Sequence, residues 1–311
     1  WIADYCAAQD SHINVLVKSG TAPAVDEYDP TFYNKHICPH PWIGYWIWPN
    51  GSTAPCCEYN GSWNNLNVRE HSHEQILHSD EMEQLREQFR TNKTPSGCKQ
   101  CLSNVPSRRD ITPFKLSNVI GTIDYEGPGQ MSYIGGHFGN LCNLKCRICS
   151  SDFSSQIAAE DIKYGNDVQA AQARQKIKVG RWSKKSTDFW QYLANTPTIK
   201  NFEFLGGEPF LLKELIGYVE NLAQSGHSED CMFDIVTNGT VVPDVIIKHH
   251  SKFKRIGITF SIDDIEDRFE LQRKNATWHE VNQNIRRMSN LDNVHARCNT
   301  TVNVMNVFYL P

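Results

Sequence analysis

The sequence has no long apolar run, and this absence excludes a membrane-spanning helix. Its longest strongly apolar stretch covers residues 41–48, whereas a membrane helix needs roughly 20 residues. It also has no excess of positive charge: among 311 residues, 35 acidic side chains outnumber 31 basic ones, for a formal net charge of −4. A surface built to hold a nucleic-acid backbone is therefore not expected. The chain starts at Trp1 rather than Met, which leaves open a missing start or a removed signal peptide.

The cysteines do not form the pattern of a disulfide framework. There are eleven, an odd number, and their spacing is clustered. Seven of them fall in two groups with metal-ligand spacing, and ligand thiolates must stay reduced, so we expect a cytoplasmic location. Cys231 and Cys298 lie in strand-like runs, where a cysteine usually behaves as a small buried hydrophobe.

Composition divides the chain into four parts. Residues 1–30 show no clear period and are predicted to be a lead-in segment, while residues 31–115 are aromatic, rich in turns and bracketed by cysteines, with a helix around 80–91. Residues 116–130 contain the breaker-rich stretch Asp124–Gln130 and are predicted to be a linker. Residues 131–311 alternate strands with helices.

The last part predicts parallel β-α units. The strands are expected at 131–136, 200–205, 231–236, 255–262 and 295–304. One helix should follow Phe210 and stop at Gly226, and another should open at a Thr277–Glu280 capping box. Repeated β-α units imply an α/β fold with right-handed crossovers, in which chemistry gathers at the carboxyl ends of the strands.

A loop with three cysteines follows the first of these strands. Cys142, Cys146 and Cys149 have the spacing Cys-x3-Cys-x2-Cys, and no fourth Cys or His follows within ten residues. A structural zinc ion needs four ligands, whereas a four-iron cubane on three thiolates keeps one iron open for another ligand. The spacing favours a reactive iron-sulfur cluster. A zinc site completed by a distant residue such as His137, or coincidence, remains an alternative.

This loop resembles that of the radical S-adenosylmethionine enzymes, and the resemblance covers most of residues 131–311. It implies a partial (β/α)6 TIM-like barrel in which Cys142, Cys146 and Cys149 hold a 4Fe–4S cluster, with S-adenosylmethionine on the open iron. The second match is Gly206, Gly207, Glu208 and Pro209, similar to the family's Gly-Gly-Glu-Pro motif, which receives the methionine amino group. Glycines allow close backbone approach and a carboxylate suits an ammonium partner, although Gly-Gly-Glu alone is also a common turn.

Further residues match the family less specifically. Thr237 and Asn238 end the third strand, and Ser261 and Asp263 end the fourth, where family members place polar groups against the cofactor. Each pair is alternatively a cap or a turn. Arg273 resembles an arginine that faces the cofactor carboxylate, the alternative being an exposed salt bridge. The residue before the last cysteine, often aromatic, is Ile148 here; an apolar side chain still suits the adenine side.

The N-terminal cysteines resemble the twitch half of a SPASM module. Cys38 is followed by twelve residues, Gly51, four residues and Cys56, and Cys98 and Cys101 follow as Cys-x2-Cys. The resemblance implies a small N-terminal cysteine-rich α+β domain over residues 31–115 that binds a second, auxiliary 4Fe–4S cluster. A four-cysteine structural zinc site and Cys57 in place of Cys56 are alternatives. The nearby histidines, His36, His40, His71 and His73, are expected at the surface.

Together these resemblances imply a radical enzyme. Reductive cleavage of S-adenosylmethionine at the 4Fe–4S cluster gives a 5′-deoxyadenosyl radical, which abstracts hydrogen from the substrate. We expect a peptide or protein side chain as substrate, with a small molecule also open, and a flavodoxin- or ferredoxin-like electron donor. No residue is assigned as a substrate acid or base. The family's sixth strand and helix should follow residues 307–311, so we expect the sequence to stop short of them.

Two other function classes are weighed against the radical enzyme. One is a non-catalytic iron-sulfur electron carrier or structural zinc protein, which should produce no 5′-deoxyadenosine. The other is an RNA-modifying radical enzyme, which the acidic balance disfavours.

Overall fold

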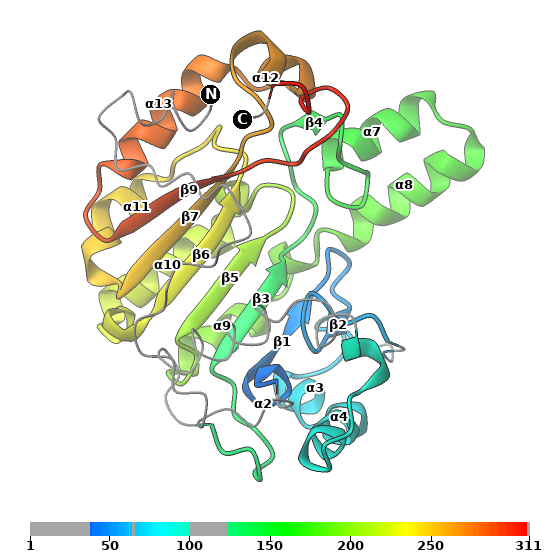
Figure 1. Cartoon of the computed structure of the whole chain (residues 1–311), viewed down its shortest axis with the longest axis vertical. Coiled ribbons are helices and arrows are strands. Elements are labelled where there is room, and N and C mark those ends of the chain that lie inside the picture. Colours follow the sequence, from blue (N-terminus) through cyan, green and yellow to red (C-terminus); the bar gives the residue numbers. More distant parts are fainter. Residues whose placement is uncertain (1–37, 62, 64–65, 100–122, 310–311) are drawn as a thin grey trace.

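A single mostly parallel sheet organises the protein, as seen in the computed structural model (Figure 1). The residues described are 38–61, 63, 66–99 and 123–309. The seven strands, in spatial order, are β2 (Thr53–Ala54), β1 (Gly44–Ile47), β3 (Tyr133–His137), β5 (Asn201–Leu205), β6 (Met232–Thr237), β7 (Arg255–Ser261) and β9 (Val294–Asn299). All neighbours are parallel except β1 and β2. The lead-in segment 1–30, residues 116–122 of the linker, His36 and Cys101 lie outside the described residues.

The five strands predicted after residue 130 are present as β3, β5, β6, β7 and β9, which confirms the α/β class with a parallel sheet. The last of them is shorter than expected, because β9 ends at Asn299. Beyond it, the Thr300 hydroxyl donates to the carbonyl of Ile262 at 2.6 Å and the Thr301 amide donates to Asp263 at 3.1 Å. The backbone after Asn299 is therefore turned toward the end of β7 instead of extending the sheet.

Helices cover one face of the sheet and bury an apolar core against it. They are α9 (Thr187–Asn195), α10 (Lys213–Ser225), α11 (Asp244–His249) and α13 (Trp278–Ser289), as Figure 1 shows. Alternate strand residues point into this core, including Phe202, whose ring stacks on Phe233 with centroids 4.6 Å apart. On the other face, Glu203 and Asp234 are only partly buried. This alternation is the period of two expected for a sheet with one apolar face.

Two of the predicted helices have the expected ends with one difference in chemistry. Helix α10 stops at Gly226, whose φ of 81° is the left-handed conformation that glycine adopts at no steric cost. Helix α13 starts after Thr277, but Thr277 does not cap the helix backbone. Its hydroxyl donates to the Glu280 carboxylate at 2.8 Å, so the expected capping box is replaced by a side-chain pair.

The N-terminal region extends the same sheet. Strand β1 pairs in parallel with β3, and α4 (Asp80–Arg90), the helix predicted at 80–91, packs Leu85 and Phe89 against a second small core with Trp42. Two short helices, α2 (His40–Ile43) and α3 (His73–Leu77), precede α4.

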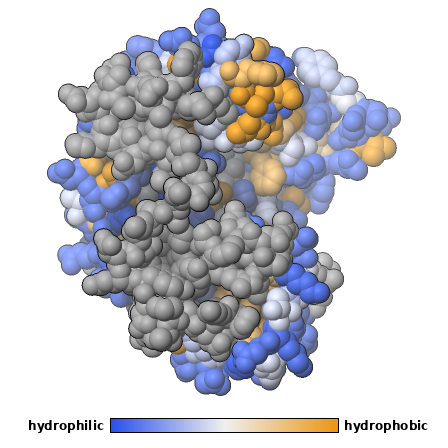
Figure 2. Space-filling model, viewed as in Figure 1, coloured by the Kyte–Doolittle hydropathy of each residue, from blue (hydrophilic) through white to orange (hydrophobic). Residues whose placement is uncertain are grey.

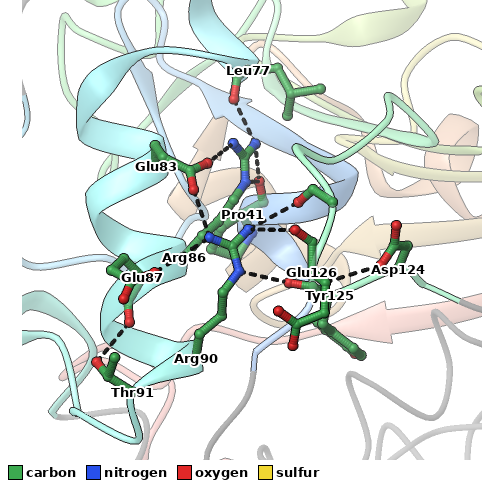
Figure 3. A network of polar contacts seen from close by, with 11 residues as sticks. Pro41, Leu77, Glu83, Arg86, Glu87, Arg90, Thr91, Asp124, Tyr125 and Glu126 are labelled. Atoms are coloured by element: carbon green, nitrogen blue, oxygen red, sulfur yellow. Dashed lines mark hydrogen bonds and ion pairs between the residues drawn. The ribbon is translucent and has the colours of Figure 1, made fainter.

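Arginine side chains of α4 tie this region together (Figure 3). Arg86 is 1% exposed and donates to the carbonyls of Pro41 at 2.7 Å and Leu77 at 2.6 Å. Arg90 donates to the carbonyl of Tyr125 at 2.9 Å, so the breaker-rich stretch after residue 123 is anchored to α4.

Other elements lie around the carboxyl ends of the strands. Helices α7 (Ser155–Tyr164) and α8 (Asp167–Val179) form a hairpin at one side of the sheet, and α12 (Glu266–Gln272) lies near a two-stranded ribbon of β4 (Lys145–Cys146) and β8 (Arg273–Lys274) (Figure 1). Exposed apolar side chains gather in the segment after β9, where Val304 and Phe308 are 88% and 87% exposed, and an orange patch lies on the face shown in Figure 2. No helix within the described ranges combines the length and apolar character needed to cross a bilayer.

Candidate iron-sulfur and cofactor site

Loops that follow four neighbouring parallel strands meet at one edge of the sheet. The strands β3, β5, β6 and β7 adjoin in this order, and their loops begin at their carboxyl ends. These loops and the last residues of β6 and β7 carry the residues predicted for the barrel site: Cys142, Cys146, Cys149, Gly206, Gly207, Glu208, Pro209, Thr237, Asn238, Ser261 and Asp263. The remaining predicted residue, Arg273, reaches the same edge through the pairing of β8 with β4. The fold therefore brings all of these predicted residues to one region.

The three-cysteine loop between β3 and α7 is held by its own hydrogen bonds. The Ser154 hydroxyl donates to the carbonyl of Leu144 at 2.8 Å, and the Cys149 amide donates to the carbonyl of Cys146 at 3.1 Å. The amide of Leu144 points at the Sγ of Cys142 at 3.4 Å. Backbone and serine contacts thus contribute to the shape of the loop.

The environment of the three thiols keeps them protonated. Burial raises the pKa of Cys142 and of Cys146 to about 11, and burial also raises the pKa of Cys149. The thiols also affect one another, since negative charge on Cys149 raises the pKa of Cys146 and negative charge on Cys142 raises that of Cys149. A metal that binds here must displace three protons, as thiolate ligation generally requires.

The number of thiols on this loop bears on the kind of metal group that it would hold. In the part of the chain that the structure describes, no three His, Cys, Asp or Glu side chains are placed to hold one metal ion. A zinc site needs its ligands to converge on one point, whereas the thiolates around a cubane bind different irons. His137, the distant residue weighed as a zinc ligand, has its ring stacked on Trp48 with centroids 5.9 Å apart. Three thiols on one loop match the three thiolate ligands of a cubane that keeps one iron open.

Gly206 and Gly207 allow the loop after β5 to press against the cysteine loop. A Cβ built on Gly207 would lie 2.2 Å from the carbonyl oxygen of Leu141, and one on Gly206 would lie 3.1 Å from that of Gly139. Gly206 also has a φ of 154°, and the amide of Glu208 donates to the Leu141 carbonyl at 2.7 Å. The close approach that these glycines permit is to the backbone that carries Cys142.

Glu208 is buried and joins the loops after β5 and β6. Its Oε1 accepts from the Thr237 hydroxyl at 2.7 Å and from the Phe210 amide at 3.1 Å, and its Oε2 accepts from the Asn238 amide at 2.7 Å. Burial raises its pKa to about 7, against the lowering effect of these hydrogen bonds and of Arg273. Because each carboxylate oxygen has two acceptor sites, Oε2 keeps one for another donor. An ammonium group would supply such a donor together with a compensating charge.

Asn143, which was not among the predicted site residues, completes this network. It accepts a hydrogen bond from the side chain of Asn238 at 3.0 Å, and the same Asn238 side chain points at the Sγ of Cys142 at 3.9 Å. Asn143 in turn donates to the hydroxyl of Thr240 at 2.8 Å. Asn143 lies beside the first cysteine in the sequence, but its spacing carries no signal, because only the fold brings Asn238 and Thr240 to it.

Arg273 is buried, so the exposed salt bridge considered for it is wrong. It is 6% exposed because β8 pairs with β4, which places Arg273 opposite Cys146. Its Nη2 lies 2.9 Å from Oδ2 of Asp263, and its Nη1 donates to the Sγ of Cys146 at 3.8 Å. Its Nε is buried without a hydrogen-bond partner in the described residues. An unused buried donor on a cation fits an anionic group such as the carboxylate of S-adenosylmethionine.

Two other residues considered from the sequence, Ser261 and Ile148, keep part of their surface exposed. Ser261 is the last residue of β7 and is half-buried. Ile148 is 39% exposed, so its apolar side chain is available beside Cys149.

Two of the N-terminal cysteines, Cys56 and Cys98, lie near Tyr59. Cys38 and Cys98 pack with Tyr59 against the second core, and negative charge on Cys98 and Cys56 contributes, after burial, to the raised pKa of Tyr59. Gly51 has a φ of 84° in the turn between β1 and β2, which explains the glycine of the motif.

The histidines near these cysteines are not all at the surface. His73 is 6% exposed and stacks on Tyr192 with ring centroids 3.9 Å apart, and burial lowers its pKa to about 3. The expectation of a surface position is wrong for His73, because α3 packs it against α9.

Comparisons with known protein families agree with this geometry. A model of the Radical SAM superfamily matches residues 137–308, more than half of the chain, and a model described as an iron-sulfur cluster-binding domain, SPASM, matches residues 38–102. No curated protein matches the chain.

Proposed function

The chain belongs to the radical SAM superfamily, and from this premise we propose that Cys142, Cys146 and Cys149 hold its 4Fe–4S cluster and that Glu208 receives the amino group of S-adenosylmethionine. The superfamily match makes the protein an enzyme that uses both of these cofactors, and the SPASM match adds an auxiliary iron-sulfur cluster. When bound, the cluster and S-adenosylmethionine supply reductive carbon–sulfur cleavage and a 5′-deoxyadenosyl radical that takes hydrogen from the substrate. The observation that carries the proposal is the contact of the Glu208 loop with the backbone of the three-cysteine loop.

The side chains around Glu208 would bind and orient the cofactor. Thr237 and Asn238 hold the carboxylate in place, and its Oε2 has an acceptor site left for the ammonium group. The free Nε of Arg273 would take the cofactor carboxylate. Gly206, Gly207 and Pro209 shape the loop, and we assign Ser261 and Asp263 to the ribose and methionine side of the same edge.

For the N-terminal region, we propose that Cys38, Cys56, Cys98 and Cys101 hold the auxiliary 4Fe–4S cluster. The SPASM match spans all four residues, and the spacing of four residues after Gly51 favours Cys56 over Cys57. A structural zinc site on the same four cysteines is the alternative. Metal analysis separates the two.

The broader organisation proposed for the chain is a partial (β/α)6 barrel over 131–311 with the auxiliary-cluster region before it. Ligand thiolates need a reducing compartment, which supports a cytoplasmic location. We assign a flavodoxin- or ferredoxin-like protein as electron donor. The proposed substrate is a peptide or protein side chain, because auxiliary modules of this type accompany peptide maturases in the family.

Iron and sulfide counts after anaerobic reconstitution test the cluster assignment. The comparison is between the wild type and a Cys142→Ala/Cys146→Ala/Cys149→Ala variant. About eight irons falling to about four in the variant supports two cubanes, one of them on the barrel loop, since each cubane holds four irons. About four irons and one zinc ion in the wild type would keep the barrel cluster and replace the auxiliary one. Wild-type protein that takes up only zinc contradicts the proposal.

A non-catalytic electron carrier is tested separately. Reduced, fully loaded protein is mixed with S-adenosylmethionine, and 5′-deoxyadenosine is measured by chromatography. An enzyme releases it in the wild type and not in the triple alanine variant, whereas a carrier releases it in neither.

A further inference from the structure

Arg273 makes a contact that cofactor binding does not require. One of its terminal nitrogens, Nη1, donates to the Sγ of Cys146 at 3.8 Å, while Asp263 lies 2.9 Å from the other, Nη2. We propose that Arg273 is a positioning residue that sets the reduction potential of the 4Fe–4S cluster through Cys146, with Asp263 as its counter-charge. This inference rests on the proposed function, because it needs a cluster on Cys146.

The backbone places Arg273 directly opposite Cys146. The two residues are direct partners in the ribbon of β4 and β8, although 127 positions separate them in the sequence. The next residue pair continues this contact, since the Arg147 amide donates to the carbonyl of Gln272 at 2.8 Å. The ribbon therefore places Arg273 beside Cys146, and burial with the ion pair to Asp263 holds its guanidinium at the sulfur.

Asp263 is held as firmly as Arg273. Its side chain is 0% exposed, and its Oδ1 accepts from the amide of Thr301 at 3.1 Å. The side chain of Asn306 donates to its backbone carbonyl at 2.7 Å. Asp263 and Arg273 thus form a buried ion pair with one end directed at a cluster ligand.

Arg273 and Asp263 should shift the reduction potential of the cluster in opposite directions. The reduced cluster carries one more negative charge than the oxidised cluster, and hydrogen bonds and net charge near the sulfurs set its potential. An N–H donor on a cation favours the reduced form and makes the potential less negative, whereas the carboxylate of Asp263 acts in the opposite direction. Removing Arg273 and removing the charge of Asp263 must therefore shift the potential in opposite directions.

The test follows the reduced-cluster signal by electron paramagnetic resonance against applied potential. It uses the anaerobically reconstituted full chain without S-adenosylmethionine, and the barrel signal is the one missing from the triple alanine variant. Arg273→Gln should shift the potential to more negative values, Asp263→Asn to more positive values, and Arg273→Lys should stay nearer the wild type. Matched controls come from the neighbouring ion pair of Asp264 and Arg268, 3.0 Å apart, so Asp264→Asn and Arg268→Gln should not move it.

A purely structural ion pair gives a different result. Loosening the pair from either side would then shift the potential in the same direction or leave it unchanged, and either outcome overturns the inference. If Arg273→Gln assembles no cluster, the sign of the shift in Asp263→Asn decides alone. Absence of the barrel-cluster signal from the wild type would contradict the proposed function itself. A normal signal with the same potential in the wild type and in the Arg273 and Asp263 variants would contradict only this inference.

Discussion

Replacement of Glu208 by glutamine separates folding from cofactor binding. The buried carboxylate accepts three hydrogen bonds, and the amide nitrogen of glutamine would face the Asn238 amide, leaving one buried donor unpaired at a cost of about 1–3 kcal/mol. Against this, a pKa raised from 4.5 to about 7 means that the charged form, with its hydrogen bonds included, costs about 3 kcal/mol above pH 7, and glutamine carries no such charge. The two contributions nearly cancel, so Glu208→Gln should fold with a similar free energy of unfolding.

Cofactor affinity should change where stability does not. Loss of a charged hydrogen bond to the ammonium group should cost about 1.5–3 kcal/mol of binding free energy, which raises the dissociation constant roughly 10- to 100-fold. The assay is calorimetric titration of the reconstituted protein with S-adenosylmethionine at pH 8. Glu203→Gln is the matched control, because Glu203 lies on β5, also has a raised pKa and accepts from Tyr133 at 3.1 Å, away from the cysteine loop. Folded Glu208→Gln protein with wild-type affinity would refute the reasoning.

Three further predictions concern stability and loading. The raised pKa of Glu208 means that its contribution to stability is complete below pH 4.5 and is lost as pH rises through about 7. In urea titrations over this range, the wild type should therefore lose up to about 3 kcal/mol of unfolding free energy relative to Glu208→Gln. Parallel curves of unfolding free energy against pH for the two proteins would contradict this. Gly207→Ala should prevent loading of the barrel cluster, because its Cβ would lie 2.2 Å from a carbonyl oxygen. Gly217→Ala, whose Cβ would meet nothing within 4 Å, should load normally and raise the free energy of unfolding by about 0.5–1 kcal/mol. Iron counts and urea titrations check both variants, and normal loading of Gly207→Ala would contradict the steric argument. Arg86→Met should lower the free energy of unfolding by about 2–5 kcal/mol, because two buried carbonyls lose their donor; a loss below about 1 kcal/mol would show that water replaces the guanidinium.

Local sequence was enough to predict the parallel strands and the three-cysteine loop. In β5 the sequence Asn201–Phe204 alternates polar with large apolar residues, and this period of two is set by the backbone of the strand alone. The order of strands along the chain then placed the cysteine loop and Glu208 at one edge, because carboxyl ends of parallel strands coincide. The end of β9 was predicted too late in the sequence. Thr300 and Thr301, which follow β9, donate hydrogen bonds to the loop after β7 rather than pairing with a neighbouring strand.

Contacts between distant residues were decided only by the tertiary structure. The sequence determined which donors are present: three thiols, one carboxylate and one guanidinium with suitable neighbours. It did not determine that Gly207 meets Leu141, that Asn143 binds Asn238, or that Arg273 is buried between Asp263 and Cys146. Such contacts depend on how separate loops pack, and packing is a property of the whole sheet and its helices rather than of any short segment.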